Sequence, residues 1–288
     1  MRRLIINADG FGFAPGVNSG IVETFRAGLV KSTSCVVNFP FIEDLPDAAA
    51  EFPSVSFGVH LNLSVGRPIS PLDRIPTLVS LSGTFWGPHF TRRLLTGRIR
   101  STEIELELTA QFQRMIDLGV RPTHWDGHQN KHLFPLFHGI GMRVAKSFGV
   151  TKLRSHRRYL VTKKDSNRRR SLSSYYLSHP KQILTHLAAR VQTLRARRNG
   201  FRTADRLITP GYVDQNQKAM AETWLMIAEI LPVGVSEIYC HPGYPDEHLR
   251  SHAAYVEERA SEIEVLCSLE LSGVFAKQGI ELISFNDL

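Results

Sequence analysis

The sequence contains little cysteine and no long apolar run. Its three cysteines, Cys35, Cys240 and Cys267, form an odd and widely spaced set, which predicts neither a disulfide framework nor a zinc knuckle. The apolar run after the first three residues is too short for a secretory leader or a membrane span, so we expect a cytoplasmic protein. Since 42% of the 288 residues are hydrophobic, the chain can enclose one sizeable core, and we expect a single domain over residues 1–288.

Positive charge is concentrated in one region. The formal net charge is +8, but residues 152–206 hold sixteen Lys and Arg against Asp165 and Asp205, so this region carries +14 and the remainder −6. Such a region can bind an anionic membrane surface, a phosphate-bearing substrate or nucleic acid, or it can be an ordinary solvated loop and helix. Residues 183–198 place apolar side chains at helical spacing with arginines between them, which predicts a basic helix. Although such a helix can lie on anionic headgroups, we expect its apolar stripe to pack on the protein itself.

Short β-rich runs alternate with helical patterns along the chain. This alternation is typical of an α/β fold built around a parallel sheet or barrel. We expect strands at residues 4–7, 33–38, 55–61, 123–125, 152–154, 236–240 and 281–285. We expect helices at residues 17–27, 102–118 with Ser101 as N-cap, 136–148, 219–230 and 253–271.

Four polar side chains lie at the carboxyl ends of predicted strands. Asp9 follows the first strand, His60 ends the third, and His128 and His241 follow later ones. Parallel sheets and barrels place their active sites at this edge, so we expect the four side chains to meet. A single histidine in such a place is more often structural than functional, but four polar groups at one topological position indicate a site.

A dense run of histidine and carboxylate surrounds one of these residues. In an extended segment alternate residues share a side, so His124, Asp126 and His128 can face one way. A metal-ligating imidazole needs an acceptor that fixes its tautomer, and Asp126 suits this role. The run indicates a metal site, although it contains no fixed ligand spacing such as His-Glu-x-x-His.

Motifs spread over the whole chain resemble those of one family. They read IINADGFG at residues 5–12, GVHLNL at 58–63, DGHQ at 126–129, HPGY at 241–244 and GIELISF at 279–285. In order and spacing they resemble the YdjC-like carbohydrate deacetylases. The resemblance implies a distorted (β/α) barrel of mostly parallel strands, here with a basic helical insertion at about residues 156–206. It also implies removal of an N-acetyl group from an amino sugar with one divalent metal ion, and residues 202–205 resemble the hopanoid-associated branch that acts on glycolipids.

Two positions depart from the family pattern. The family reads Asn-Ala-Asp-Asp-Phe-Gly, in which the first aspartate acts as general base and the second binds the metal. Asp9 matches the first, but Gly10 stands in place of the second and has no ligand atom. Asn130 stands where the family commonly has another histidine, while His132 is retained.

The resemblance implies a role for each candidate residue. His60 and His128 hold the metal, which polarises the amide carbonyl and lowers the pKa of a bound water. Asp9 takes a proton from that water, and His241 protonates the leaving amine. Arg154, at the end of its own predicted strand, orients Asp9, binds a sugar oxygen or phosphate, or forms a surface ion pair. Zn²⁺ and Mg²⁺ are the candidate metals, and the loss of one carboxylate ligand favours Zn²⁺.

Three functions follow from these observations. The first is a metal-dependent hydrolase that removes an N-acetyl group from an amino sugar, with a lipid- or phosphate-linked substrate indicated by the basic region. The second is a catalytically impaired carbohydrate-binding homologue, which Gly10 favours. The third, a nucleic-acid-associated protein, has the least support, because the basic region has no regular recognition motif and few aromatic residues. We therefore expect the hydrolase, cytoplasmic or bound peripherally at the inner face of a membrane.

Overall fold

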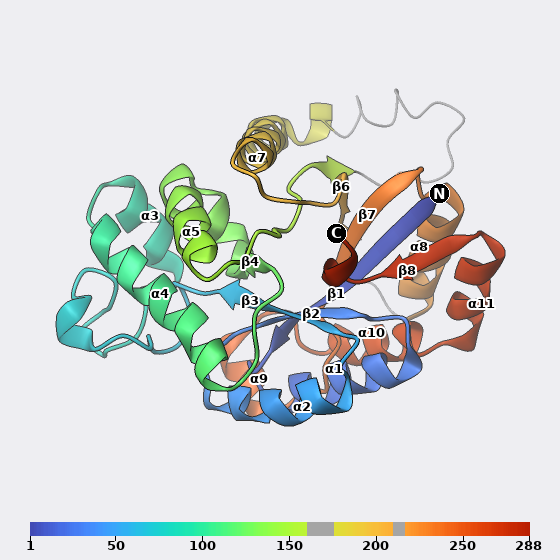
Figure 1. Ribbon diagram of the computed structural model, residues 1–288, viewed down its shortest axis with the longest axis horizontal. Coiled ribbons are helices and arrows are strands. Elements are labelled where there is room, and N and C mark those ends of the chain that lie inside the picture. Colours follow the sequence, from blue (N-terminus) through green and yellow to red (C-terminus); the bar gives the residue numbers. More distant parts are fainter. Residues whose placement is uncertain (160–175, 210–216) are drawn as a thin grey trace.

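A curled parallel sheet forms the centre of the fold (Figure 1). The computed structural model describes residues 1–159, 176–209 and 217–288. Neighbouring strands follow the order β4-β3-β2-β1-β7-β6-β5, and β8 also pairs with β1. All pairings between these strands are parallel. The strands are β1 (Arg2–Phe11), β2 (Ser32–Cys35), β3 (Ser56–Leu61), β4 (Trp125–Gly127), β5 (Arg158–Tyr159), β6 (Arg206–Ile208), β7 (Gly234–Cys240) and β8 (Ile280–Ile283).

Two isolated bridges extend the curl of the sheet beyond its edge strand β4. Trp125 of β4 pairs with Leu153, and Lys152 pairs with Arg202, both in parallel. These bridges stand in place of the strand expected at residues 152–154, and they span the gap between β4 and the chain that leads into β6. The expected α/β class and distorted (β/α) barrel are confirmed.

Helices surround the sheet (Figure 1). The first, α1, begins at Pro15, whose fixed φ suits the first helical turn, and it is followed by Gly28 at a φ of 84°. Its buried side chains Val17, Ile21 and Phe25 recur every four residues on one face. The helices are α1 (Pro15–Ala27), α2 (Leu45–Glu51), α3 (Phe90–Leu95), α4 (Ser101–Asp117), α5 (Pro135–Ser147), α7 (Pro180–Arg198), α8 (Gln217–Ile230), α9 (Glu247–His252), α10 (Glu258–Leu266) and α11 (Leu269–Lys277).

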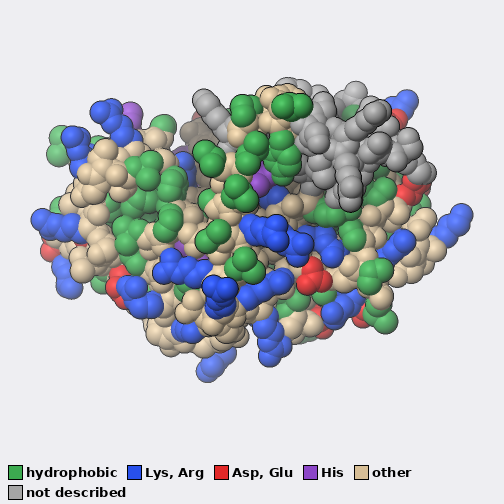
Figure 2. All heavy atoms as spheres, turned by 90° about the horizontal axis from the view of Figure 1, so that it is seen from above, with side chains coloured by type: hydrophobic (Ala, Val, Ile, Leu, Met, Phe, Trp, Pro, Cys, Tyr) green, Lys and Arg blue, Asp and Glu red, His purple; other side chains and the backbone are tan. Residues whose placement is uncertain are grey.

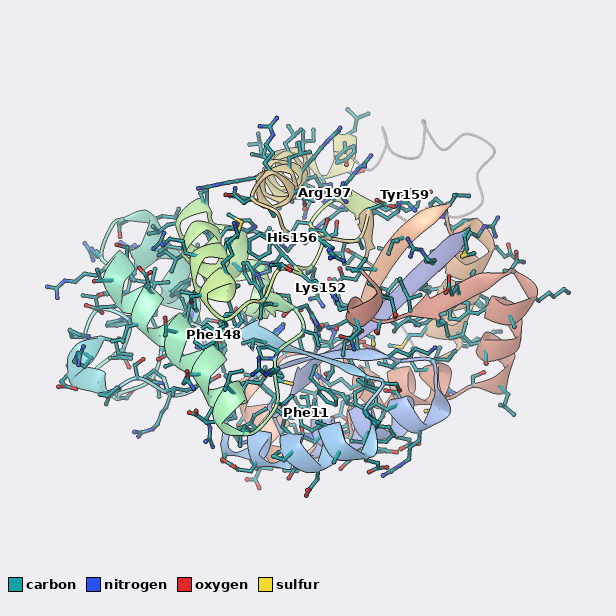
Figure 3. All side chains as sticks on the ribbon, in the orientation of Figure 1. Phe11, Phe148, Lys152, His156, Tyr159 and Arg197 are labelled. Atoms are coloured by element: carbon teal, nitrogen blue, oxygen red, sulfur yellow. The ribbon has the colours of Figure 1, made fainter. Side chains whose placement is uncertain are left out.

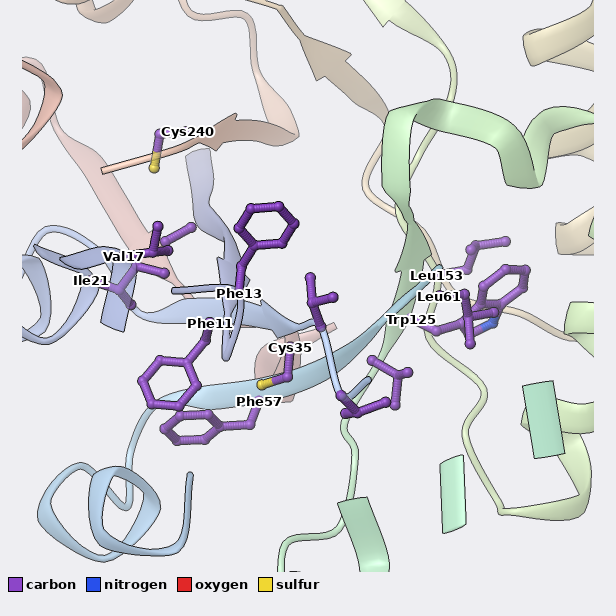
Figure 4. Close-up of a cluster of buried hydrophobic side chains, with 14 of the residues drawn as sticks. Phe11, Phe13, Val17, Ile21, Cys35, Phe57, Leu61, Trp125, Leu153 and Cys240 are labelled. Atoms are coloured by element: carbon purple, nitrogen blue, oxygen red, sulfur yellow. The ribbon is translucent and has the colours of Figure 1, made fainter. Parts of the chain in front are cut away.

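Apolar side chains on both faces of the sheet form the core. Strands β1, β2 and β3 are buried along nearly their whole length, as expected for a parallel sheet covered on both faces. Phe11 of β1 meets Phe57 of β3 edge to face, with ring centroids 6.4 Å apart (Figure 4). Trp125 of β4 is fully buried in the same core. This packing fixes the carboxyl ends of the strands, where the candidate residues follow.

Some predicted boundaries are wrong for local reasons. The single helix expected at residues 253–271 is two helices, α10 and α11, because Ser268 starts a new helix by accepting a hydrogen bond from the Leu271 amide. Ser101 is not an N-cap, since it is the first residue of α4 and Arg100 holds the cap position. Strands β5 and β6 were not expected because two and three residues are too few to show a pattern.

The expected basic helix is present as α7, but its apolar stripe faces away from the rest of the protein. The prediction that its apolar stripe packs on the protein is wrong. Four small or polar side chains are buried instead: Ala189, Gln192, Thr193 and Ala196. Five apolar side chains are between 41% and 74% exposed: Ile183, Leu184, Leu187, Val191 and Leu194. The inward face is held by polar contacts, since Thr193 Oγ1 accepts a hydrogen bond from the His156 amide at 3.0 Å.

The basic region is described only in part. Residues 160–175 of the predicted insertion lie outside the described residues, and the single-domain organisation stays a prediction. In the three described ranges, no helix is long and apolar enough to cross a membrane.

Candidate active site

The four side chains expected to meet line one cavity. It has a volume of about 260 Å³ and lies at the carboxyl ends of β1, β3 and β7. Asp9 comes from β1 and His60 from β3, while His128 follows β4 and His241 follows β7. Arg154 also lines this cavity. Because typical ligand sites have volumes of about 300–1,000 Å³, this cavity suits one small unit such as a single sugar ring.

A buried arginine connects three carboxylates beside the cavity. The Arg154 side chain is 3% exposed, and its Nη1 and Nη2 donate to Asp9 Oδ2 and Oδ1 at 2.6 and 2.5 Å. Nη2 also lies 2.8 Å from Asp126 Oδ2, and Nε donates to Glu237 Oε1 at 2.7 Å. Two-pronged pairing of this kind holds Asp9 in one orientation. Arg154 is therefore not part of a surface ion pair.

Burial and the arginine charge act in opposite directions on these carboxylates. Burial raises the pKa of Asp9, but the charge and hydrogen bonds of Arg154 more than offset this, so the pKa lies below its ordinary value. The pKa of Asp126 is lowered in the same way, with His60 adding to the effect of Arg154. In Glu237 burial prevails and raises the pKa to about 7. Asp9 and Asp126 are thus ionised at neutral pH.

A carboxylate fixes the orientation of the first imidazole. His60 Nδ1 lies 2.6 Å from Asp126 Oδ1, and Ser34 Oγ donates to Asp126 Oδ2 at 3.0 Å. Burial lowers the pKa of His60, but the adjacent Asp126 more than offsets this, so the pKa is raised. Because Nδ1 is engaged, Nε2 is the nitrogen left for the cavity.

The imidazoles present ligand atoms that fit a divalent ion such as Zn²⁺. The ring centroids of His60 and His128 are 5.5 Å apart, and no hydrogen bond from the described residues reaches a His128 ring nitrogen. Burial, then the nearby His60 and His241, lowers the pKa of His128 to about 3, so this ring is neutral and can bind a metal. Asp9, His60 and Asp126 bring ligand atoms within 4.8 Å of one another. Both Asp9 and Asp126 have their oxygens in polar contacts, but only Asp9 lines the cavity, so Asp9 is the carboxylate that could reach an ion there.

Helix α10 holds the turn that carries the fourth side chain. The His241 amide donates to Glu262 Oε2 at 2.8 Å, and the Tyr255 hydroxyl donates to Glu262 Oε1 at 2.5 Å. Burial, then the charge of Arg259, lowers the pKa of His241 to about 3. The ring is therefore neutral before a substrate binds.

The glycine that departs from the family pattern has an unusual backbone. Gly10 lines the cavity beside Asp9 with a φ of 109°, a region that favours glycine. The nearest neighbour of a Cβ built there would be Val17 Cγ1 at 3.8 Å. The cavity thus has room for a side chain, but an aspartate does not readily adopt this backbone conformation. Asn130, the second departure, also lines the cavity.

The site contains residues that the sequence analysis did not single out. Arg259 and Tyr239 line the cavity, and Glu237 contacts Arg154. Arg259 Nε donates to the Tyr255 carbonyl at 2.8 Å, while its other two nitrogens have no hydrogen-bond partner within the described residues. Glu237 could have been found from the sequence, because it is an acid within the apolar run of β7 and a buried acid needs a partner.

Other histidines of the 124–132 run lie outside the cavity. His124 Nε2 lies 3.1 Å from Asn7 Oδ1, and its ring stacks on Phe285 with centroids 3.7 Å apart. His124 is therefore a buried structural residue. His132 Nε2 lies 2.9 Å from Nε2 of His156, which Figure 3 shows between α7 and the sheet.

Comparison with known proteins gives the same family as the motifs. The chain matches the family model described as YdjC-like protein over residues 3–277. "Carbohydrate deacetylase 1" of Listeria innocua serovar 6a is 31% identical over 288 residues, which cover 99% of this chain and 100% of that protein. The carbohydrate deacetylase of Brevibacillus brevis is 30% identical over 291 residues, which cover 99% of each chain.

Solved structures share the architecture. A protein of Enterococcus faecalis V583, provisionally assigned to cellobiose-phosphate cleavage, has a TM-score of 0.75 at 27% identity, and the match covers 99% of this chain and 98% of that one. The lactam utilization protein of Thermus thermophilus has a TM-score of 0.51 at 13% identity over 98% and 99% of the two chains, a similarity of fold alone. The family expected from the sequence is confirmed, and the chain belongs to the YdjC-like proteins.

Proposed function

We propose that this protein is a hydrolase that removes an N-acetyl group from an amino sugar. The observation that carries the proposal is the meeting of Asp9, held by Arg154, with His60, His128 and His241 around one cavity. Relatives that match over their whole length are named carbohydrate deacetylases, which supports this reaction class. Amide hydrolysis requires a proton acceptor and a proton donor, whereas sugar binding alone does not.

Asp9 is the proton acceptor in this proposal. Its carboxylate is ionised and fixed in orientation, so it can accept a proton from the water that attacks the acyl carbon. Arg154 is the positioning residue for Asp9. Because its nitrogens contact three carboxylates, they are poorly available to a sugar phosphate.

His241 passes a proton to the leaving amine. Its pKa of about 3 makes the ring neutral at the start, so the proton comes from the attacking water through Asp9 rather than from a preformed imidazolium. The charge of Asp9 favours the protonated ring once the proton arrives. The C–N bond then breaks, acetate leaves with the oxygen of the water, and the amine leaves with the proton.

His60 and His128, with Asp9 beside them, are the residues that would hold a divalent ion. When bound, such an ion supplies Lewis acidity that polarises the acyl carbonyl. Two imidazoles and one carboxylate favour Zn²⁺ over Mg²⁺, since Mg²⁺ prefers oxygen ligands.

We further propose that the substrate carries an anionic group, such as a phosphate or a phosphate-linked lipid. Arg259 lines the cavity with two guanidinium nitrogens that have no hydrogen-bond partner within the described residues. A guanidinium in this setting pairs well with phosphate oxygens.

Acetate release tests the reaction directly. The purified chain, supplied with Zn²⁺, is expected to release acetate from diacetylchitobiose or from N-acetylglucosamine phosphate. Asp9→Asn preserves the shape of the side chain but removes the proton acceptor, so the rate should fall about 10²–10⁴-fold. Asp73→Asn, at an exposed aspartate that does not line the cavity, is the matched control and should keep the wild-type rate. An unchanged rate in Asp9→Asn, or no acetate with any divalent metal, would contradict the proposal.

The second candidate, a carbohydrate-binding protein without catalysis, is favoured by Gly10, which offers no ligand atom. Gly10→Asp restores a carboxylate at a position with room for it but at a φ of 109°, so it should cost about 1–3 kcal/mol of stability. Gly10→Ala is the matched control, because it introduces the same strain without a ligand. Both variants should lose similar stability in urea unfolding, and only Gly10→Asp should retain more Zn²⁺ on gel filtration. Activity that appears in Gly10→Asp and is absent from the wild type would favour the impaired homologue.

A further inference from the structure

The outward face of α7 is apolar. Its five exposed apolar side chains recur at intervals of one, three and four residues, so they form one stripe along the helix: Ile183, Leu184, Leu187, Val191 and Leu194. The opposite face, with Ala189 and Ala196 buried, packs on the protein. Exposed apolar side chains that adjoin one another in this way mark a place of interaction.

Arginines border this stripe. Arg190 lies two helical turns beyond Ile183 at one border, and Arg195 lies about one turn beyond Val191 at the other. Both are exposed, and neither forms an ion pair within the described residues. Asp205 is the one acid in the sequence between residues 176 and 209. Figure 2, which views the side on which α7 lies, shows apolar side chains next to many Lys and Arg and few Asp or Glu.

A second cavity, here called the arginine cavity, opens beside the stripe. It has a volume of about 580 Å³ and lies between α7, β5 and β6. Four of its lining residues are arginines and two are apolar residues of the stripe: Arg157, Arg158, Arg190, Arg206, Ile183 and Leu187. No acid lines it within the described residues. Burial, and the like charge of Arg157, lower the pKa of Arg206, so an anion in the cavity would relieve a repulsion.

We infer that α7 and the arginine cavity form a docking surface for a bilayer that contains anionic phospholipids. The apolar stripe enters the headgroup layer, and the arginines bind lipid phosphates. An apolar protein partner would not need Arg190 and Arg195, which are exposed and form no ion pair within the described residues, and nucleic acid would not use the exposed leucines. Charge complementarity and the outward apolar stripe therefore favour the lipid surface. This inference goes beyond the proposed function, because docking does not depend on amide hydrolysis.

Vesicle flotation with the full chain tests the docking surface. The protein should float with vesicles of phosphatidylcholine and phosphatidylglycerol in equal parts, and it should stay in solution with phosphatidylcholine alone. Binding should weaken as sodium chloride is raised, since salt screens exposed charges. Failure to bind the anionic vesicles at low salt would overturn the inference.

Paired variants separate the apolar and the charged contributions. The double variant Leu187→Ser and Val191→Ser should lower vesicle affinity more than about tenfold, because two apolar side chains no longer enter the bilayer. Arg190→Gln should lower it about fivefold. Leu269→Ser on α11 replaces a leucine that is 89% exposed elsewhere, and Arg26→Gln replaces an exposed arginine of α1, so both should bind as the wild type does. Acetate release should be unchanged in all four proteins, which keeps this test apart from that of the reaction.

Two further outcomes would overturn the inference. If Arg190→Gln weakens binding while the double variant does not, the apolar stripe does not enter the bilayer. If inorganic phosphate displaces the protein at a much lower ionic strength than sodium chloride does, the arginine cavity binds a free phosphate rather than a membrane surface. Equal displacement by the two salts at matched ionic strength is the expected result.

Discussion

Arg154 and the exposed arginines of α7 show opposite uses of the same charge. Arg154 is buried and contacts the carboxylates of Asp9, Asp126 and Glu237 at 2.5–2.8 Å. Arg190 and Arg195 of α7 are exposed and form no ion pair within the described residues, and the same helix turns its leucines outward. A buried guanidinium must be paired, and its partners are thereby fixed in place, whereas an exposed one remains available to an outside partner. Arg154 therefore holds the carboxylates beside the cavity in place, whereas the exposed arginines of α7 remain available to bind an outside partner.

The largest effect is expected where the buried arginine loses its charge. Arg154→Gln leaves three buried carboxylates without their shared partner, so the free energy of unfolding should fall by about 3–5 kcal/mol. Arg143→Gln is the matched control, because it removes one arginine from an exposed ion pair with Glu105 and should cost about 1 kcal/mol or less. Urea unfolding of both variants measures the difference. Equal losses would show that Arg154 does not organise the carboxylates.

Buried imidazoles, unlike exposed ones, should make the stability of the protein depend on pH. Burial lowers the pKa of six histidines well below the unfolded value of about 6.5: His124, His128, His132, His138, His156 and His241. Below about pH 6.5 the unfolded chain therefore binds more protons at these histidines than the folded chain does. The free energy of unfolding from this source is complete above about pH 6.5 and falls as the pH decreases, by at most about 1.4 kcal/mol per pH unit for each group. Glu237 and Glu262, with pKa values raised to about 7, act in the opposite sense, as do Glu107 and His60, whose pKa values are also raised, but these four groups are fewer than the six histidines.

Unfolding in urea at about pH 7.5 and about pH 5 measures this dependence. His156→Gln removes one member of the His132–His156 pair and should flatten the curve. The exposed His89→Gln should leave the curve unchanged. Stability that rises or stays level toward pH 5 would contradict the assignment of neutral buried histidines.

The smallest effect is expected for the exposed arginines. Arg190→Gln and Arg195→Gln remove charges that form no ion pair within the described residues, so each should change the free energy of unfolding by less than about 0.5 kcal/mol. The same urea unfolding provides the measurement. A loss above about 1 kcal/mol would mean that α7 uses these charges to hold its own position.

The sequence was sufficient for the parts of the fold in which pattern and position agree. Strands β1, β3 and β7 are largely apolar runs with a polar side chain close to or just past their carboxyl ends, so both the strands and the meeting of Asp9, His60 and His241 at one edge could be expected. Short strands such as β5 carry too few residues for a pattern. Arg259 is a single arginine in an ordinary helix, and only the packing of α10 brings it to the cavity.

The orientation of α7 shows a limit of helical periodicity. A repeat of apolar residues shows that Leu187 and Val191 share a face, but not whether another part of the protein covers that face. The opposite face of α7 packs through Ala189 and Ala196, whose small side chains carry little signal in a sequence. The backbone of Gly10 is a similar case, since its φ of 109° follows from the local turn and not from the residue type alone.

Anomalous diffraction at the zinc edge, from crystals soaked in Zn²⁺, tests directly whether His60 and His128 can hold a metal ion. We expect one strong peak at about 2.0–2.1 Å from a ring nitrogen of His60 and of His128, next to the Asp9 carboxylate. A peak confined to the pair His248 and His252 on α9, whose rings stack with centroids 4.3 Å apart, would contradict this expectation. The absence of any peak between His60 and His128 would contradict it as well.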